Sequence, residues 1–151
     1  MASLVPDGSR MDRDDLDAMA DVWKAIGNAT RLATLRGMRE ERTLQAIADD
    51  IGVSRNAVQM QSRELEERDL IYRDVDADYR YQLTPVGETL LELNDEFGPV
   101  FVEALKRVEE AEEEAREENA HLSGDTFERA VEQRKWALVR NELQELLERE
   151  L

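Results

Sequence analysis

The chain has 151 residues, 41% of them apolar, which is enough for one hydrophobic core with attached segments. It has no cysteine and a single histidine, His121, which excludes disulfides, thiolate metal sites and histidine-rich metal chemistry; we expect no metal site and no cofactor. Its 36 acidic and 20 basic residues give a net charge of -16, the wrong sign for ordinary attraction to phosphate.

Residues 1–12 predict a flexible tail, because they are polar and include Pro6 and Gly8. The tail lacks the basic patch and apolar run of a secretory signal, and either Met1 or Met11 can be the start. No segment is apolar for long enough to span a bilayer. We therefore expect a cytoplasmic protein with no membrane partner.

Two helices are predicted next, from apolar side chains at helical spacing. The face that begins at Leu16 predicts a helix from Asp14 that ends at Gly27. Asn28 is a good N-cap for a second helix, which reaches about Arg39.

A second pair of helices is joined by a very short turn. Thr43 is an N-cap for a short helix that Gly52 stops, and Ser54 is an N-cap for a helix to about residue 68. Val58 and Leu65, seven residues apart, mark the buried side of that last helix. Two helices joined this tightly form a helix-turn-helix unit.

The hydrophobic period then changes from helical to alternating. The runs 70–75 and 79–83 predict two short strands, with a turn at residues 76–78. Thr84 and Pro85 form an N-cap and N1 pair for a helix that Gly98 and Pro99 are expected to interrupt. Charged helical sequence follows, and Asp125 fits the spacing of a capping box for a last helix.

This order of elements is the layout of a winged helix-turn-helix. The segments AIGNATRLATLRGM, LQAIADDIGVSRNAVQMQSRELEERDLI and YRYQLTPVGETLLEL resemble haloarchaeal winged regulators of the ArsR-like kind, with MarR-like and GbsR-like proteins as close alternatives. The resemblance implies a mostly α fold with a small β-hairpin wing. Residues 13–97 would be the DNA-binding domain with an N-terminal dimerisation helix, and residues 98–151 would be C-terminal dimerisation helices.

The fourth helix carries side chains suited to reading bases in the major groove. Arginine pairs with guanine, asparagine and glutamine pair with adenine, and methionine contacts a thymine methyl. The candidates, at positions that the resemblance implies as well, are Ser54, Arg55, Asn56, Gln59, Met60 and Arg63. The alternative is that they form a solvated helix face. Ser62 stands where similar proteins usually have leucine, which could tilt the helix or create a wet contact.

Further arginines are candidates for phosphate contacts. Arg73 and Arg80 flank the hairpin turn, where winged regulators place basic residues on the DNA backbone or minor groove. Arg31 is a candidate on the second helix, although snorkelling along the core or a salt bridge with Glu40 is an equal alternative. The tip of the hairpin carries Asp74, Asp76 and Asp78, so cations bound at the DNA interface are expected to bridge it to phosphate.

The distribution of charge bears on how an acidic chain meets DNA. Residues 22–39 and 51–63 contain no acidic residue, and all but three of the basic residues are arginine. An acid-rich, lysine-poor composition resembles that of proteins from salt-accumulating haloarchaea; an acidic mesophilic protein is the alternative. In molar salt the Debye length falls to about 3 Å, which mutes self-repulsion.

Surplus apolar side chains in the first helix and beyond Gly98 predict a twofold dimer, which would bring two recognition helices to half-sites one turn apart. The candidate interface residues are Trp23, Phe97, Phe101, Leu105, Trp136, Val139, Leu143 and Leu146. The alternative is that the last helix folds back within its own subunit.

We therefore expect a homodimeric, sequence-specific transcriptional regulator that binds double-stranded DNA, with repression favoured and activation left open. We do not expect an enzyme, because no nucleophile with a base, no pair of acids and no phosphate-binding glycine motif rises above chance. Acidic residues are so frequent that any pair of carboxylates is uninformative. The rivals are a protein-interaction module built on the winged domain and an architectural chromatin protein without sequence preference.

Overall fold

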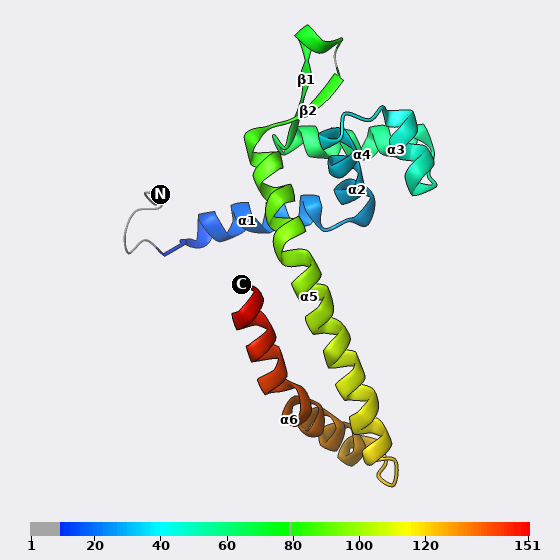
Figure 1. The fold of residues 1–151 in the computed structure, drawn as a ribbon. Helices are drawn as coiled ribbons and strands as arrows, with labels where there is room; N and C mark the ends of the chain where they lie inside the picture. The colour runs from blue at the N-terminus through cyan, green and yellow to red at the C-terminus, as the bar shows by residue number, and fades with distance from the viewer. Residues whose placement is uncertain (1–9, 79) are drawn as a thin grey trace. The chain divides into compact units, whose positions relative to one another are not determined.

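The computed structural model describes residues 10–78 and 80–151, so most of the predicted tail lies outside the described residues. The described chain is mostly helical, with one small two-stranded antiparallel sheet (Figure 1). It divides into two compact units, Met1–Leu91 and Glu92–Leu151, and each is considered by itself. No helix in the described ranges combines the length and apolar character needed to cross a membrane.

The first two helices of the N-terminal unit begin at side-chain caps. Helix α1 (Arg13–Ile26) starts at Asp12, which forms a reciprocal capping box with Asp15. Helix α2 (Ala29–Arg39) starts at Asn28, whose side-chain oxygen accepts the backbone N–H of Arg31 at 3.0 Å. The predicted helices at these positions are confirmed.

Helices α3 (Leu44–Ile51) and α4 (Arg55–Glu67) are also confirmed, together with their caps. Thr43 Oγ1 accepts the N–H of Ala46, and Ser54 Oγ accepts the N–H of Ala57, each at 3.1 Å. Between the helices, Gly52 has a left-handed backbone with φ 78°, which glycine adopts without steric cost. Because of these caps and the glycine turn, α4 begins shortly after α3 ends.

The core of this unit lies where α4 packs against α2 and α3. Val58 and Leu65 of α4 are fully buried, as predicted. Ser62 is buried between them, and its hydroxyl donates to the carbonyl of Val58 at 2.8 Å, so it needs no wet contact. The buried core residues are Ala25, Ile26, Leu35, Met38, Ile47, Ala48, Val58, Leu65, Leu70, Ile71 and Leu91.

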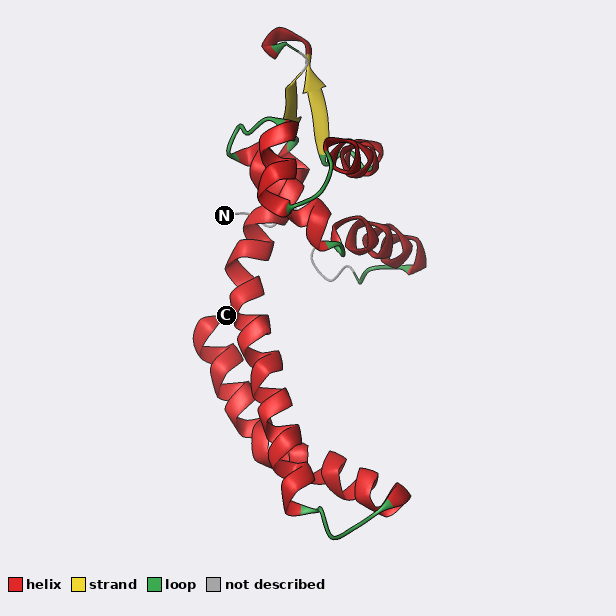
Figure 2. Ribbon diagram, turned by 90° about the vertical axis from the view of Figure 1, so that its right-hand side faces the viewer, coloured by secondary structure: helices red, strands yellow, loops and turns green. Residues whose placement is uncertain are grey.

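The predicted hairpin is formed by β1 (Ile71–Asp74) and β2 (Arg80–Leu83), which pair antiparallel with Ile71 opposite Leu83. The turn contains a short 3₁₀-helix, Val75–Ala77, and Asp74 accepts the N–H of Asp76. Figure 2 shows the hairpin projecting from the helices of its unit.

Two backbone segments meet at Leu70: the connection from α4 to β1, and the start of helix α5 (Pro85–Glu118) after β2. The carbonyl of Leu70 accepts the N–H of Thr84 at 3.0 Å, and the Thr84 hydroxyl donates to the carbonyl of Asp69 at 2.6 Å. Gly87 lies so close that a Cβ atom there would stand 2.1 Å from the Leu70 oxygen. This junction therefore fixes the start of α5 against the hairpin.

Substituting Gly87→Ala is expected to destabilise the protein by about 2–3 kcal/mol, because the new methyl group would overlap a backbone oxygen that is already held by a hydrogen bond. The lowered midpoint of urea unfolding would measure the loss. Glu92→Ala, at an exposed position further along α5, is the control and should change stability by less than about 0.5 kcal/mol. Equal urea midpoints for the two variants would contradict the close approach of Gly87 to the Leu70 carbonyl.

The expected interruption at Gly98 and Pro99 is wrong, because α5 continues through both residues. Proline removes one helical hydrogen bond, and its ring clashes with the carbonyl four residues earlier and with the N–H and Cβ of the preceding residue. Gly98 has no Cβ, so one of these clashes is absent where α5 passes Pro99. Most of α5 thus belongs to the C-terminal unit.

Helix α6 (Gly124–Glu150) forms an antiparallel hairpin with α5 in the C-terminal unit (Figures 1 and 2). Ion pairs join the helices, including Arg134 Nε to Glu118 Oε2 at 2.6 Å and Arg107 to Glu142. The capping box expected at Asp125 is wrong: Ser123 is the N-cap residue, and it makes no side-chain capping bond.

The interior of this helical hairpin corrects part of the predicted dimer interface. Val139 and Leu146 are buried within the single chain. They share that interior with small residues of α5, among them Ala104, Ala111 and Ala115. The alternative, in which the last helix folds back within its own subunit, therefore accounts for these two residues.

Candidate nucleic-acid interface

Helix α4 presents most of the predicted base-reading residues to solvent. Its N-terminal turn and the side opposite Val58 and Leu65 carry exposed polar and apolar side chains. The exposed candidates are Ser54, Arg55, Asn56, Met60 and Arg63. Gln59 is half-buried at the edge of this face.

The electrostatics of α4 differ between its two ends. The first turns contain no acidic residue, and the helix N-terminus adds a partial positive charge. The C-terminal part carries Glu64, Glu66 and Glu67. The N-terminal end of α4 is therefore the part of the helix best suited to an anionic partner.

The two hairpin arginines have different surroundings. Arg80 is exposed and lies opposite Asp74 in the strand register. Arg73 lies opposite Tyr81, and its Nη2 and Nε atoms donate to the tyrosine oxygen at 2.8 and 3.2 Å. Its guanidinium carbon is 4.9 Å from the centre of the Tyr81 ring.

Tyr81 was not among the predicted site residues, although the sequence contained a signal for its contact. A turn centred on Ala77 places residues 73 and 81 directly opposite each other, as the register shows. An arginine beside a tyrosine across two strands can form both a hydrogen bond and a cation–π contact.

Arg31 is less exposed than Arg55 and Arg63. Its side chain is half-buried, and its Nε atom is buried without a hydrogen-bond partner among the described residues. This placement favours the predicted alternative in which the side chain runs along the core. We therefore leave Arg31 out of the candidate interface.

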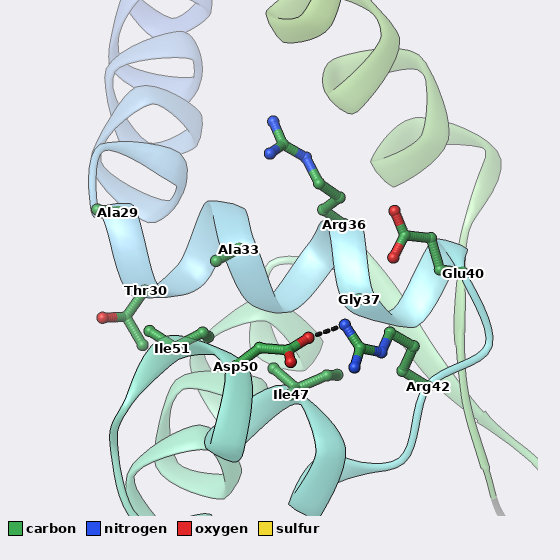
Figure 3. A pocket seen from close by; sticks show the side chains of 10 residues that line it. All are labelled: Ala29, Thr30, Ala33, Arg36, Gly37, Glu40, Arg42, Ile47, Asp50 and Ile51. Carbon is green, nitrogen blue, oxygen red and sulfur yellow. Dashed lines mark ion pairs between the residues drawn. The ribbon is translucent and has the colours of Figure 1, made fainter.

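A groove of about 400 Å³ opens between α2 and α3 (Figure 3). Its lining combines small or aliphatic side chains, such as Ala33 and Ile51, with an ion pair between Arg42 and Asp50. In Figure 3 the Arg36 side chain points away from this pair. None of the candidate DNA contacts lines the groove, so it is separate from the exposed face of α4.

The predicted dimer residues occupy different environments within their units. In the N-terminal unit, Trp23 is 58% exposed. In the C-terminal unit, Phe101 and Leu105 of α5 are 51% and 66% exposed, and Trp136 of α6 is 39% exposed. Phe97 and Leu143 are half-buried. A large apolar face of α5 therefore remains in contact with solvent in the single chain.

A charged cluster on α6 lies beside α5. Lys135 is buried; its Nζ donates to Glu132 Oε2 at 2.8 Å and lies 3.8 Å from Glu112 Oε1 of α5. The hydrogen bond to Glu132 raises the pKa of Lys135, and the same bond, with one from Trp136 Nε1, lowers the pKa of Glu132. Both partners thus remain charged at neutral pH, and the cluster supports the intrachain hairpin.

The described residues contain no group of three or more acidic or histidine side chains placed to hold a metal ion. The arrangement on α4 instead offers hydrogen-bond donors and acceptors of the types that pair with base edges. No family model, curated protein or solved structure matches the chain.

Proposed function

We propose that the chain is a homodimeric, sequence-specific DNA-binding transcriptional regulator of the haloarchaeal ArsR-like kind, with a winged helix-turn-helix fold. The observation that carries the proposal is the exposed, acid-free N-terminal half of α4, directly after the tight turn at Gly52. In an otherwise very acidic chain, this is the surface best suited to DNA.

In this proposal α3 and α4 are the helix-turn-helix, and α4 is the recognition helix. Such a helix enters the major groove with its N-terminal residues toward the base edges. Arg55 would pair with guanine, Asn56 with adenine, and Met60 would contact a thymine methyl. The exposure of these three side chains supports these roles.

The hairpin β1–β2 is the proposed wing. Arg73 and Arg80 would contact phosphates, which position the protein without reading sequence. The tip of the hairpin also carries Asp74, at the end of β1, and Asp76 and Asp78 in the turn, and these carboxylates repel phosphate. Cations held between these carboxylates and the DNA would offset that repulsion in molar potassium.

The acidic wing predicts an unusual salt dependence: binding should weaken little, or tighten, as KCl rises into the molar range. Cation uptake at the wing would offset the counterion release that normally weakens protein–DNA binding. Fluorescence anisotropy across KCl concentrations measures the slope. An ordinary steep loss of affinity across molar KCl would contradict the prediction.

A double variant isolates the role of the wing in this salt effect. Asp76→Asn with Asp78→Asn removes two charges while suiting the left-handed backbone at Asp78, where asparagine is well tolerated. This variant should bind more tightly at low KCl and show a steeper salt-dependent loss. Glu109→Gln with Glu110→Gln removes the same charge from exposed positions of α5 and should keep the wild-type slope.

The exposed apolar face of α5 supports the proposed homodimer, with Phe101 and Leu105 at its centre. A twofold dimer would present two recognition helices to half-sites one helical turn apart. A dimer bound over a promoter blocks polymerase without further machinery, so we propose repression as the mode of action.

Genome-wide mapping of bound sites in the native host tests this function. We expect discrete sites upstream of genes, with loss of those sites when Arg55 and Asn56 are both replaced by alanine. Even coverage without sequence preference would instead identify an architectural chromatin protein. Absence of DNA from the bound material, with protein partners retained, would identify a protein-interaction module.

A further inference from the structure

Arg73 is held by residues from two other elements. Tyr81 on β2 accepts hydrogen bonds from Arg73 Nε and Nη2, and its ring lies beneath the guanidinium at 4.9 Å. Glu66 on α4 lies close as well, with its Oε2 atom 3.9 Å from Arg73 Nε. The three side chains therefore connect the proposed recognition helix to both strands of the hairpin.

The contacts of Arg73 with Tyr81 and with Glu66 differ in strength. The 2.8 Å hydrogen bond and the ring contact define the position of the guanidinium closely. The distance between Arg73 and Glu66 is near the limit for an ion pair, and both side chains are substantially exposed. This ion pair can therefore break at small energetic cost. Among the described residues, the Nη1 atom of Arg73 has no hydrogen-bond partner.

We propose that Tyr81 is a positioning residue that holds Arg73 ready for a DNA phosphate, and that Glu66 is a built-in competitor of that phosphate. The inference rests on the proposed DNA-binding function. An arginine whose guanidinium is already oriented loses less conformational freedom when it binds phosphate. A phosphate that engages the remaining N–H groups at Nη1 and Nη2 would keep the Tyr81 contacts. Glu66 competes with it through its negative charge and not for an N–H group, because its contact is with Nε, whose single hydrogen is donated to Tyr81.

Affinity for double-stranded DNA gives the first test. Tyr81→Phe keeps the half-buried ring but removes the acceptor, and should weaken binding about three- to tenfold. This is less than the full effect of a hydrogen bond to a charged group, because Tyr81 orients Arg73 and does not itself contact DNA. Glu66→Gln should tighten binding about two- to fivefold by removing the competitor. Glu64→Gln, an exposed position on the same helix, removes an equal charge and should have a smaller effect.

A double-mutant cycle separates positioning from general charge or folding effects. Arg73→Gln should weaken binding to all DNA sequences alike and change the salt slope by about one unit, as expected for one phosphate contact. In that background, Tyr81→Phe and Glu66→Gln should each have no further effect. Effects that persist without Arg73, or a Glu66→Gln variant that behaves like Glu64→Gln, would overturn the proposal.

A measurement without DNA distinguishes failure of the proposed positioning role of Tyr81 from failure of the proposed DNA-binding function. Hydrogen exchange at Arg73 Nε, followed by NMR, should accelerate in Tyr81→Phe and stay unchanged in Glu64→Gln. Wild-type protein that binds no DNA refutes the proposed function and the phosphate role together, whereas the exchange rate still decides whether Tyr81 orients Arg73. Unchanged exchange in Tyr81→Phe would overturn the positioning role even if DNA binds.

Discussion

Replacing Arg55 and Asn56 together with alanine is expected to lower affinity for the specific DNA site by about 100-fold or more. Each bidentate contact to a base edge contributes roughly 1–3 kcal/mol of discrimination. Both side chains are exposed at the start of α4, so their removal should leave the fold intact. The residual binding should be non-specific, because the proposed phosphate contacts of the hairpin would remain.

Titration of labelled DNA, with and without the preferred site, measures this loss. Circular dichroism would show that the helices are retained. Arg129→Ala with Gln144→Ala is the matched control, since it truncates an arginine and an amide at exposed positions of α6. If the Arg55 and Asn56 variant bound the site as tightly as this control, α4 would not be the recognition helix.

The second large effect is expected from Leu105→Glu, which should convert the proposed dimer to a monomer. Leu105 is 66% exposed in the single chain, so a glutamate there remains hydrated in the monomer. In a dimer through this face of α5, the same carboxylate would lose its water without an assured partner. We expect dimer affinity to fall at least about 100-fold, and DNA affinity to fall with it, because the two half-sites would no longer be bound together.

Light scattering during size-exclusion chromatography measures this change. Leu151→Glu is the control, because it makes the same substitution at an exposed residue at the end of the chain. A wild-type protein that is monomeric at working concentration would reject the dimer. A Leu105→Glu protein that stays dimeric would place the interface elsewhere.

The helices of the N-terminal unit could be predicted because their signals are local. Asn28, Thr43 and Ser54 act within three residues of the backbone groups that they cap, and Gly52 ends α3 through its own backbone angle. Burial of Val58 and Leu65 follows from their spacing along one helix. Such features depend little on the rest of the chain.

The C-terminal unit was harder to predict. The continuity of α5 depends on opposing local effects at Gly98 and Pro99, and the burial of α6 depends on tertiary packing. A proline such as Pro99 normally breaks a helix, and the absent Cβ of Gly98 relieves only part of that penalty, so the local sequence alone does not decide that α5 continues. Apolar spacing along α6 shows that Val139 and Leu146 must be covered. It does not show whether α5 of the same chain or a second copy covers them.

The candidate site could be predicted in part. Exposure of Arg55, Asn56 and Met60 follows from the helical period, whereas Gln59 lies at the boundary of the buried face. The half-buried position of Arg31 depends on how neighbouring helices pack. The contact between Arg73 and Tyr81 required the hairpin register as well as the residue types.

Selection of double-stranded DNA from a random-sequence pool, carried out in molar KCl, tests the central claim most directly. We predict convergence on a twofold-symmetric site with half-site centres about 10 base pairs apart, and no convergence with the Arg55 and Asn56 double variant. Failure of the wild-type protein to enrich any sequence, across low and high KCl, would contradict sequence-specific recognition by α4.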